Sequence, residues 1–223
     1  DDVTKVAAVI PAGNARDAER ESRAALSRGA DLAELRLDHL GRVDAAIVRN
    51  LAAAVGPRSI ATLRTTDQGG AGGPPAGIRS SLLNEIAAQR FAYVDIELKA
   101  DGDQAGELRK IARRRRTVLI ASHHFSKPAD DADVRDTLEA CAAIGDVAKV
   151  AVPGADPEFA IQLVDLARMQ AERKRRFVII ATGTTGMITR ALADDAGQEI
   201  QYASWGQAVA PGQLSLGAAK RLR

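Results

Sequence analysis

The chain has 223 residues, 46% hydrophobic, which is enough to fill a sizeable core. Its 31 basic and 29 acidic side chains leave a formal charge of +2, and only 3% of its residues are aromatic, so composition gives no reason to expect a nucleic-acid or acidic-membrane partner. A single cysteine, Cys141, excludes an internal disulfide. No apolar stretch approaches the roughly 20 residues of a membrane span, and no signal peptide opens the chain. We therefore expect a cytoplasmic protein.

Short aliphatic segments alternate with longer amphipathic segments along the whole chain, which predicts repeated βα units around a parallel sheet. We predict strands at residues 5–10, 32–38, 58–64, 92–98, 116–122, 146–152, 176–182 and 199–204. We predict helices at residues 15–28, 43–55, 78–90, 103–115, 131–144, 157–173, 186–194 and from 214 to the end. This alternation predicts an α/β protein that is a single (β/α)8 TIM barrel over residues 1–223. An open doubly wound sheet is the structural alternative, because it would not need the strand at 199–204.

Polar residues follow several predicted strands, and in such a barrel the carboxyl ends of the strands carry the active site. Glu34 and Arg36 alternate along the second strand, so both point to one face. Arg64 ends the third strand, and Gln68 follows four residues later. These residues predict a preorganised polar site, and the alternative is a structural ion-pair network at the barrel mouth.

A lysine lies within the apolar sixth strand, residues 146–152. Burying its ammonium is costly unless Lys149 is paired or gives up its proton easily, and a lysine that does so is an amine nucleophile. The alternative is that Lys149 caps the strand and extends to water. The fifth strand ends in His123 and His124, of which only one can face the site, because adjacent strand residues point oppositely. The two histidines are therefore a poor metal pair, but one of them is a candidate acid or base beside the lysine.

Two loops near the carboxyl end of the chain complete the candidate site. Residues 183–190 join the seventh strand to its helix, where backbone N–H groups can face an anion. Arg190 would add a bidentate donor for a carboxylate. Residues 209–213 follow the eighth strand, in a loop that could close over the site.

Taken together, these segments resemble the type I 3-dehydroquinate dehydratases, (β/α)8 enzymes of the shikimate pathway. The resemblance covers nearly the whole chain and is specific because the motifs occur in order at the predicted strand ends. The segments are Glu34-Leu35-Arg36-Leu37-Asp38, Leu63-Arg64-Thr65, Ser122-His123-His124-Phe125, Val147-Ala148-Lys149-Val150-Ala151, Gly183 to Arg190, and Ala210-Pro211-Gly212-Gln213.

The resemblance implies a role for each matching residue. Lys149 would form a Schiff base with the substrate ketone, and His123 would be the catalytic acid and base. Gln68 would orient the histidine, although many members carry a glutamate there. The remaining residues would bind substrate, Arg190 and Gln213 at its carboxylate and Glu34, Arg36 and Arg64 near its ring hydroxyls.

The prediction is a lyase that dehydrates 3-dehydroquinate to 3-dehydroshikimate without cofactor or metal. Its expected partner is this small-molecule substrate, with no nucleic acid or membrane, and the resemblance allows a homodimer. One alternative is another Schiff-base-forming barrel, such as a class I aldolase acting on a sugar phosphate. The other is a non-catalytic binding module, against which the polar residues at the strand ends argue.

Overall fold

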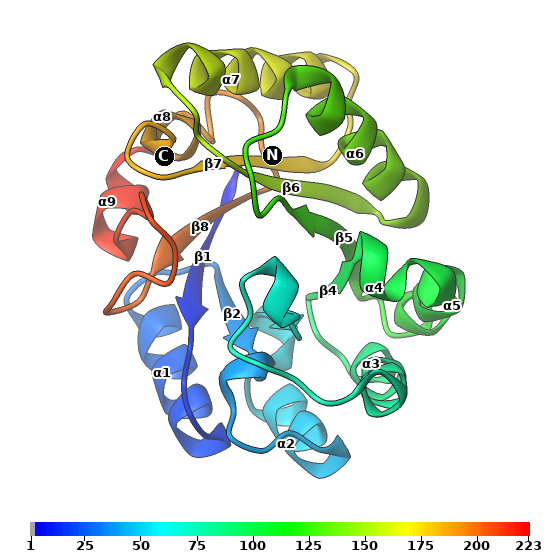
Figure 1. Ribbon diagram of the computed structural model, residues 1–223. Helices are drawn as coiled ribbons and strands as arrows, with labels where there is room; N and C mark the ends of the chain where they lie inside the picture. The colour runs from blue at the N-terminus through cyan, green and yellow to red at the C-terminus, as the bar shows by residue number, and fades with distance from the viewer. Residues whose placement is uncertain (1–2) are drawn as a thin grey trace.

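The computed structural model describes residues 3–223, in which strands and helices alternate as Figure 1 shows. The strands are β1 (Lys5–Ile10), β2 (Leu32–Arg36), β3 (Ser59–Thr62), β4 (Tyr93–Glu97), β5 (Val118–His124), β6 (Val147–Pro153), β7 (Phe177–Thr182) and β8 (Ile200–Ser204). The α-helices are α1 (Ala15–Ser27), α2 (Ala45–Val55), α3 (Ala76–Ala88), α4 (Leu98–Asp101), α5 (Ala105–Arg114), α6 (Asp131–Ile144), α7 (Pro157–Glu172), α8 (Met187–Ala191) and α9 (Leu216–Arg221). Short 3₁₀ turns include Leu37–His39 after β2 and Thr66–Gln68 after β3.

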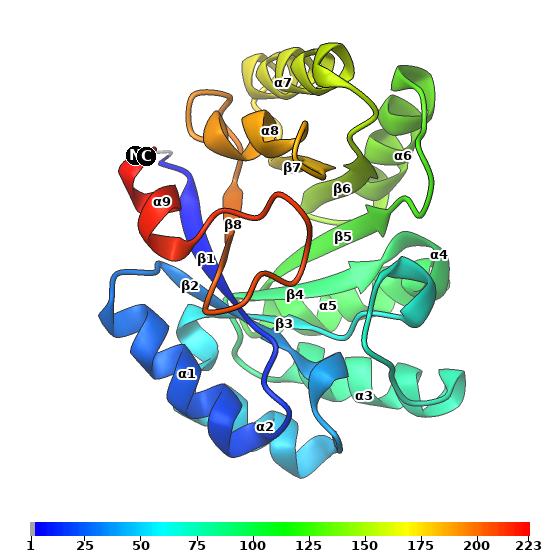
Figure 2. The same ribbon diagram turned by 60° about the vertical axis from the view of Figure 1, so that its left-hand side comes forward.

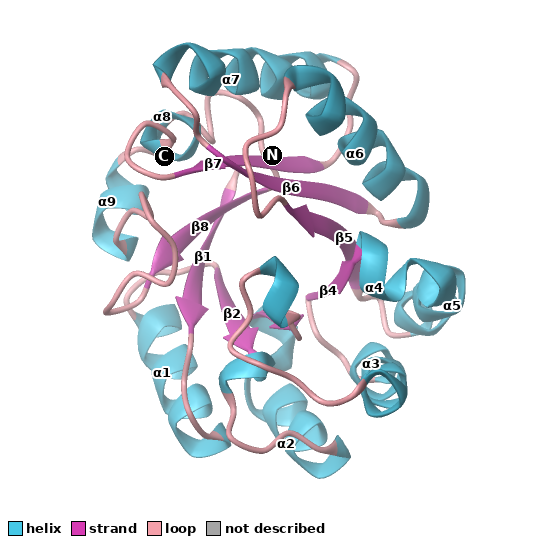
Figure 3. Cartoon of the chain, in the orientation of Figure 1, coloured by secondary structure: helices cyan, strands magenta, loops and turns pink. Residues whose placement is uncertain are grey.

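The strands form one parallel sheet in the order β7-β6-β5-β4-β3-β2-β1-β8. The backbone N–H of Glu199, next to β8, donates to the carbonyl of Phe177 on β7 at 2.9 Å, which brings the two ends of the sheet together. Helices surround the strands in Figures 1 and 3. The predicted TIM barrel is therefore confirmed, including the strand expected at 199–204. Within residues 3–223 no helix is long and apolar enough to cross a membrane.

Most observed elements lie within a few residues of the predicted ones, because strong local signals place them. Asp156 caps α7 by accepting the N–H of Phe159 at 2.8 Å, and Pro157 takes the first helical position. The helix predicted at 103–115 is preceded by the separate short helix α4, and the one predicted at 186–194 is reduced to α8. Both differences lie on the carboxyl side of a strand, and Arg190 of α8 lines a pocket there.

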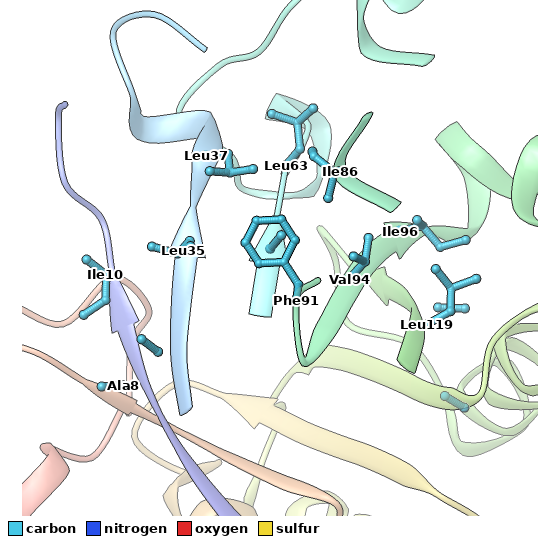
Figure 4. Packing of buried hydrophobic residues seen from close by; sticks show 14 of the residues in the cluster. Ala8, Ile10, Leu35, Leu37, Leu63, Ile86, Phe91, Val94, Ile96 and Leu119 are labelled. Atoms are coloured by element: carbon cyan, nitrogen blue, oxygen red, sulfur yellow. The ribbon is translucent and has the colours of Figure 1, made fainter. Parts of the chain in front are cut away.

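The barrel has two apolar layers, one on each face of the sheet. Outward-facing residues pack under the helices, as Figure 4 shows for Leu35, Leu63 and Phe91. A smaller cluster fills the barrel interior, and it includes both tyrosines of the chain, Tyr93 and Tyr202. Because strand residues alternate, Leu35 faces the helices while Glu34 and Arg36 face the interior. The polar residues gather in this interior at the carboxyl ends of the strands.

Candidate active site

A cavity of about 460 Å³ opens at the carboxyl ends of the strands. The loop between β8 and α9, drawn in orange to red in Figure 2, crosses the barrel and supplies Val209 to Pro211 and Gln213 to the cavity wall. The predicted site residues that line the cavity are Glu34, Arg36, Arg64, Gln68, Lys149, Arg190 and Gln213. His124 also lines it, whereas His123 is not among the lining residues.

Lys149 reaches this cavity from β6 and is only 3% exposed. Its Nζ lies 3.0 Å from Oδ2 of Asp95 and 3.8 Å from Oε1 of Glu34. The alternative that this lysine extends to water along the strand is excluded, because the amine is held inside the barrel by carboxylates. A buried amine at the base of a cavity can reach a carbonyl carbon of a bound molecule.

The carboxylate that pairs with Lys149 belongs to a larger buried network. Arg64 lies 2.9 Å from Asp95 and 3.2 Å from Glu97, and it also donates to Oγ of Ser122 at 2.8 Å. Burial opposes the ionised form of Asp95, but the charges of Arg64 and Lys149 outweigh it and lower the pKa of that carboxyl to about 2. Asp95 is therefore an anion at neutral pH. Arg64 was predicted to contact substrate, but its guanidinium N–H groups bind Asp95, Glu97 and Ser122.

The structure corrects the expected orientation of the histidine pair. Ser122 lies opposite Lys149 in the sheet and its hydroxyl donates to Asp95 at 2.6 Å, so Ser122 faces the interior. Alternation then places His124 on the same face and His123 on the opposite one. The His123 ring packs edge-on against Phe125, with ring centroids 4.7 Å apart. The prediction that His123 faces Lys149 is therefore wrong, because it followed the family pattern instead of the parity of β5.

His124 is poised as a neutral imidazole. Burial, followed by the charges of Arg64, Lys149 and Arg36, holds the pKa of its side chain well below the usual range. Its Nδ1 is buried and has no hydrogen-bond partner within residues 3–223. Gln68 accepts the backbone N–H of His124 at 2.9 Å, so this amide fixes the strand end that carries the ring. A neutral imidazole facing the cavity can accept a proton from a bound molecule.

Arg190 is a buried cation with no acidic partner among the described residues. It is 5% exposed, its Nη1 lies 3.5 Å from the carbonyl of Tyr202, and its Nε finds no partner in the part of the chain that the structure describes. Burial alone lowers the pKa of its guanidinium to about 10. A buried guanidinium of this kind is a preformed receptor for an anion, above all a planar carboxylate.

Three further predicted residues lie around the rim. Arg36 donates to both carboxylate oxygens of Asp38 at 2.9 and 2.7 Å, which fixes its position at the wall. Glu34 accepts from the hydroxyl of Thr62 at 3.0 Å. Oε1 of Gln213 accepts the N–H of Val209 at 3.1 Å, so Gln213 holds the turn of the closing loop. All three line the cavity.

Sequence reasoning did not assign a role to two residues that touch Lys149. Asp95 was noticeable as an acid alternating with Glu97 along β4, but nothing in the sequence paired it with a lysine two strands away. Tyr202 lies in the strand predicted at 199–204, in which the sequence analysis singled out no residue. Nζ of Lys149 lies 4.0 Å from the centroid of the Tyr202 ring.

A cavity with these charged groups at the carboxyl ends of eight parallel strands is characteristic of (β/α)8-barrel enzymes, which place their catalytic residues there. Comparison with known proteins narrows this class. A family model described as type I 3-dehydroquinase matches residues 6–222. The chain therefore belongs to the type I 3-dehydroquinase family.

Several relatives are similar over nearly their full length. A 3-dehydroquinate dehydratase of Methanosarcina acetivorans is 31% identical over 231 residues, covering 99% of this chain and 95% of the relative. One from Thermococcus gammatolerans is 32% identical over 213 residues, covering 95% and 93%. The crystal structure of the 3-dehydroquinate dehydratase from Aquifex aeolicus has 26% identity and a TM-score of 0.85, covering 99% and 97%. That from Geobacillus kaustophilus shares the fold with a TM-score of 0.88 at 23% identity, covering 98% of this chain and 89% of its own.

Proposed function

We propose that this protein is a hydro-lyase that converts 3-dehydroquinate to 3-dehydroshikimate and water through an imine on Lys149. One observation carries the proposal: a buried amine, a neutral imidazole and a buried guanidinium share one small cavity in a member of this family. We further propose that residues 1–223 form one catalytic domain in the cytoplasm that uses no cofactor or metal.

The substrate carboxylate would bind Arg190, which has no acidic partner within residues 3–223. A carboxylate that moves from water into this site would pair with the guanidinium, for which the described residues provide no acidic partner. Gln213, in the loop over the cavity, would add a neutral donor. Binding at this end directs the ring of the substrate toward Glu34, Arg36 and the lysine.

The chemistry begins when the ammonium of Lys149 gives a proton to the neutral imidazole of His124 and its Nζ attacks the ketone carbon. The imidazolium returns the proton to the hydroxyl of the carbinolamine, which leaves as water, and the product is a protonated imine whose positive charge lies where the ammonium was, 3.0 Å from Asp95. Asp95 is already an anion, so it stabilises this cation without a proton transfer. The protonated imine withdraws electrons from the neighbouring carbon and acidifies its C–H bond.

His124 then acts twice. As a neutral imidazole it removes the acidified proton, and the electron pair moves to the imine nitrogen to give an enamine. The resulting imidazolium gives its proton to the β-hydroxyl, which leaves as water while the enamine reforms a conjugated imine. Addition of water to that imine releases the enone product and the free amine of Lys149. The atoms balance, since the net change is loss of one water.

The test is the absorbance of the conjugated enone after 3-dehydroquinate is added. We expect absorbance to rise with the wild-type protein and to fall to background with Lys149→Ala. A His123→Ala variant is the matched control, because this side chain lies on the opposite face of β5. Turnover by Lys149→Ala at the wild-type rate would contradict the imine, and no turnover by the folded wild type would contradict the whole proposal. Sugar phosphates serve as the comparison substrates for the aldolase alternative.

A further inference from the structure

Tyr202 occupies an unusual position between the two cations of the site. Its ring faces Nζ of Lys149 at 4.0 Å from the centroid, and its carbonyl accepts from Arg190 at 3.5 Å. The residue is 5% exposed and belongs to the cluster that fills the barrel interior. It comes from β8, whereas Lys149 is on β6, so the ring reaches the amine past the intervening strand β7.

The ring is the part of Tyr202 that matters for the amine. The hydroxyl is buried and has no hydrogen-bond partner among residues 3–223, so it does not tie the side chain to a polar neighbour described there. The face of an aromatic ring carries negative potential and attracts a cation within about 6 Å of its centroid, more strongly where water is excluded. Lys149 meets both conditions, with Asp95 at 3.0 Å.

We propose that Tyr202 is a positioning residue whose ring face holds the Lys149 nitrogen in its cationic forms, first as ammonium and then as the protonated imine. The inference rests on the proposed function, since the ring affects turnover only if the Lys149 nitrogen becomes a protonated imine during the reaction. Asp95 and Glu34 lie 3.0 and 3.8 Å from the nitrogen, and the ring supplies further stabilisation without adding a third carboxylate that would have to be desolvated. A ring also cannot take the proton from the imine, so the electron sink is preserved.

The experiment changes the electrostatics of the ring and keeps its shape. Residue 202 is replaced with phenylalanine and then with phenylalanines of increasing fluorination, which drains the negative potential from the ring face. We expect Tyr202→Phe to retain activity and kcat to fall stepwise with fluorination, to about ten-fold below the unfluorinated variant, while KM changes little. The fraction of Lys149 trapped by borohydride with 3-dehydroquinate should fall in the same order.

The chain supplies a matched control in its other tyrosine. Tyr93 lies in the same interior cluster, and its hydroxyl donates to Glu199 at 2.6 Å, at the opposite end of the barrel from the cavity. The same fluorinated series at residue 93 should leave kcat unchanged. If kcat does not change with fluorination at residue 202, or falls equally at both positions, the proposed role of the ring is overturned. If the wild type traps no substrate at all, the proposed function has failed instead, so the two failures are distinguishable.

Discussion

Replacement of Arg190 by methionine should make the free protein more stable and disable it as a receptor for carboxylates. Burial lowers the pKa of this guanidinium to about 10, against an ordinary value of about 12.5. At ~1.4 kcal/mol for each unit of pKa, the charge destabilises the folded state by roughly 3 kcal/mol at every pH well below 10. Loss of the contact to the Tyr202 carbonyl offsets about 1 kcal/mol. The free energy of unfolding should therefore rise by about 2 kcal/mol.

Urea unfolding measures the expected increase in the free energy of unfolding. Calorimetric titration with 3-dehydroshikimate measures the expected loss of binding. We expect affinity to fall by at least about 100-fold, because a buried charge pair is no longer formed. Arg36→Met is the control, because it makes the same change beside a fully buried acid, Asp38. It should destabilise the protein by about 3 kcal/mol or more. If Arg190→Met destabilises as much as Arg36→Met does, or still binds the product, the reasoning on an unneutralised guanidinium is refuted.

Three further predictions address the other groups of the site. His124→Ala should lower kcat by about 100-fold or more, whereas His123→Ala should stay close to wild type; the reverse result would restore His123 as the base. Gln213→Ala should raise KM with little change in kcat, and an unchanged KM would remove this side chain from substrate binding. Because the pKa of Asp95 is depressed from 3.8 to about 2, its ionisation contributes stability above pH 4 that is lost as the pH falls toward 2. Asp95→Asn should remove about 2 kcal/mol of the decrease in the free energy of unfolding at acid pH, as measured by urea unfolding. If this pH dependence is the same as in the wild type, Asp95 is not the group responsible.

The order of elements could be predicted because each barrel unit carries its own local signals. Aliphatic runs such as Val147 to Val152 specify buried strands, and Asp156-Pro157 specifies a helix start. The candidate site followed from the same alternation, since polar residues in otherwise apolar strands must gather at the barrel mouth. Lys149 stood out for that reason, but its role as the Schiff-base lysine came from the family resemblance.

What escaped prediction depends on contacts between distant segments. The face taken by His124 is set by strand parity, which Ser122 fixes through its bond to Asp95. The family resemblance pointed to His123, because a motif match does not say which face of β5 each of two adjacent histidines takes. The contact between Tyr202 on β8 and Lys149 on β6 depends on how the sheet closes between β7 and β8, and no spacing in the sequence encodes it. The division of the predicted helix after β4 likewise arises where Asp101 at the end of α4 binds Arg79 from α3 at 2.8 Å.

The imine on Lys149 is the central claim, and borohydride reduction in the presence of 3-dehydroquinate tests it most directly. Intact-mass and peptide analysis should show one substrate-derived adduct, localised to the peptide that contains Lys149 and absent from Lys149→Ala. The adduct should depend on both substrate and reductant. An active protein that yields no adduct, or one whose adduct lies on another lysine, would contradict the account.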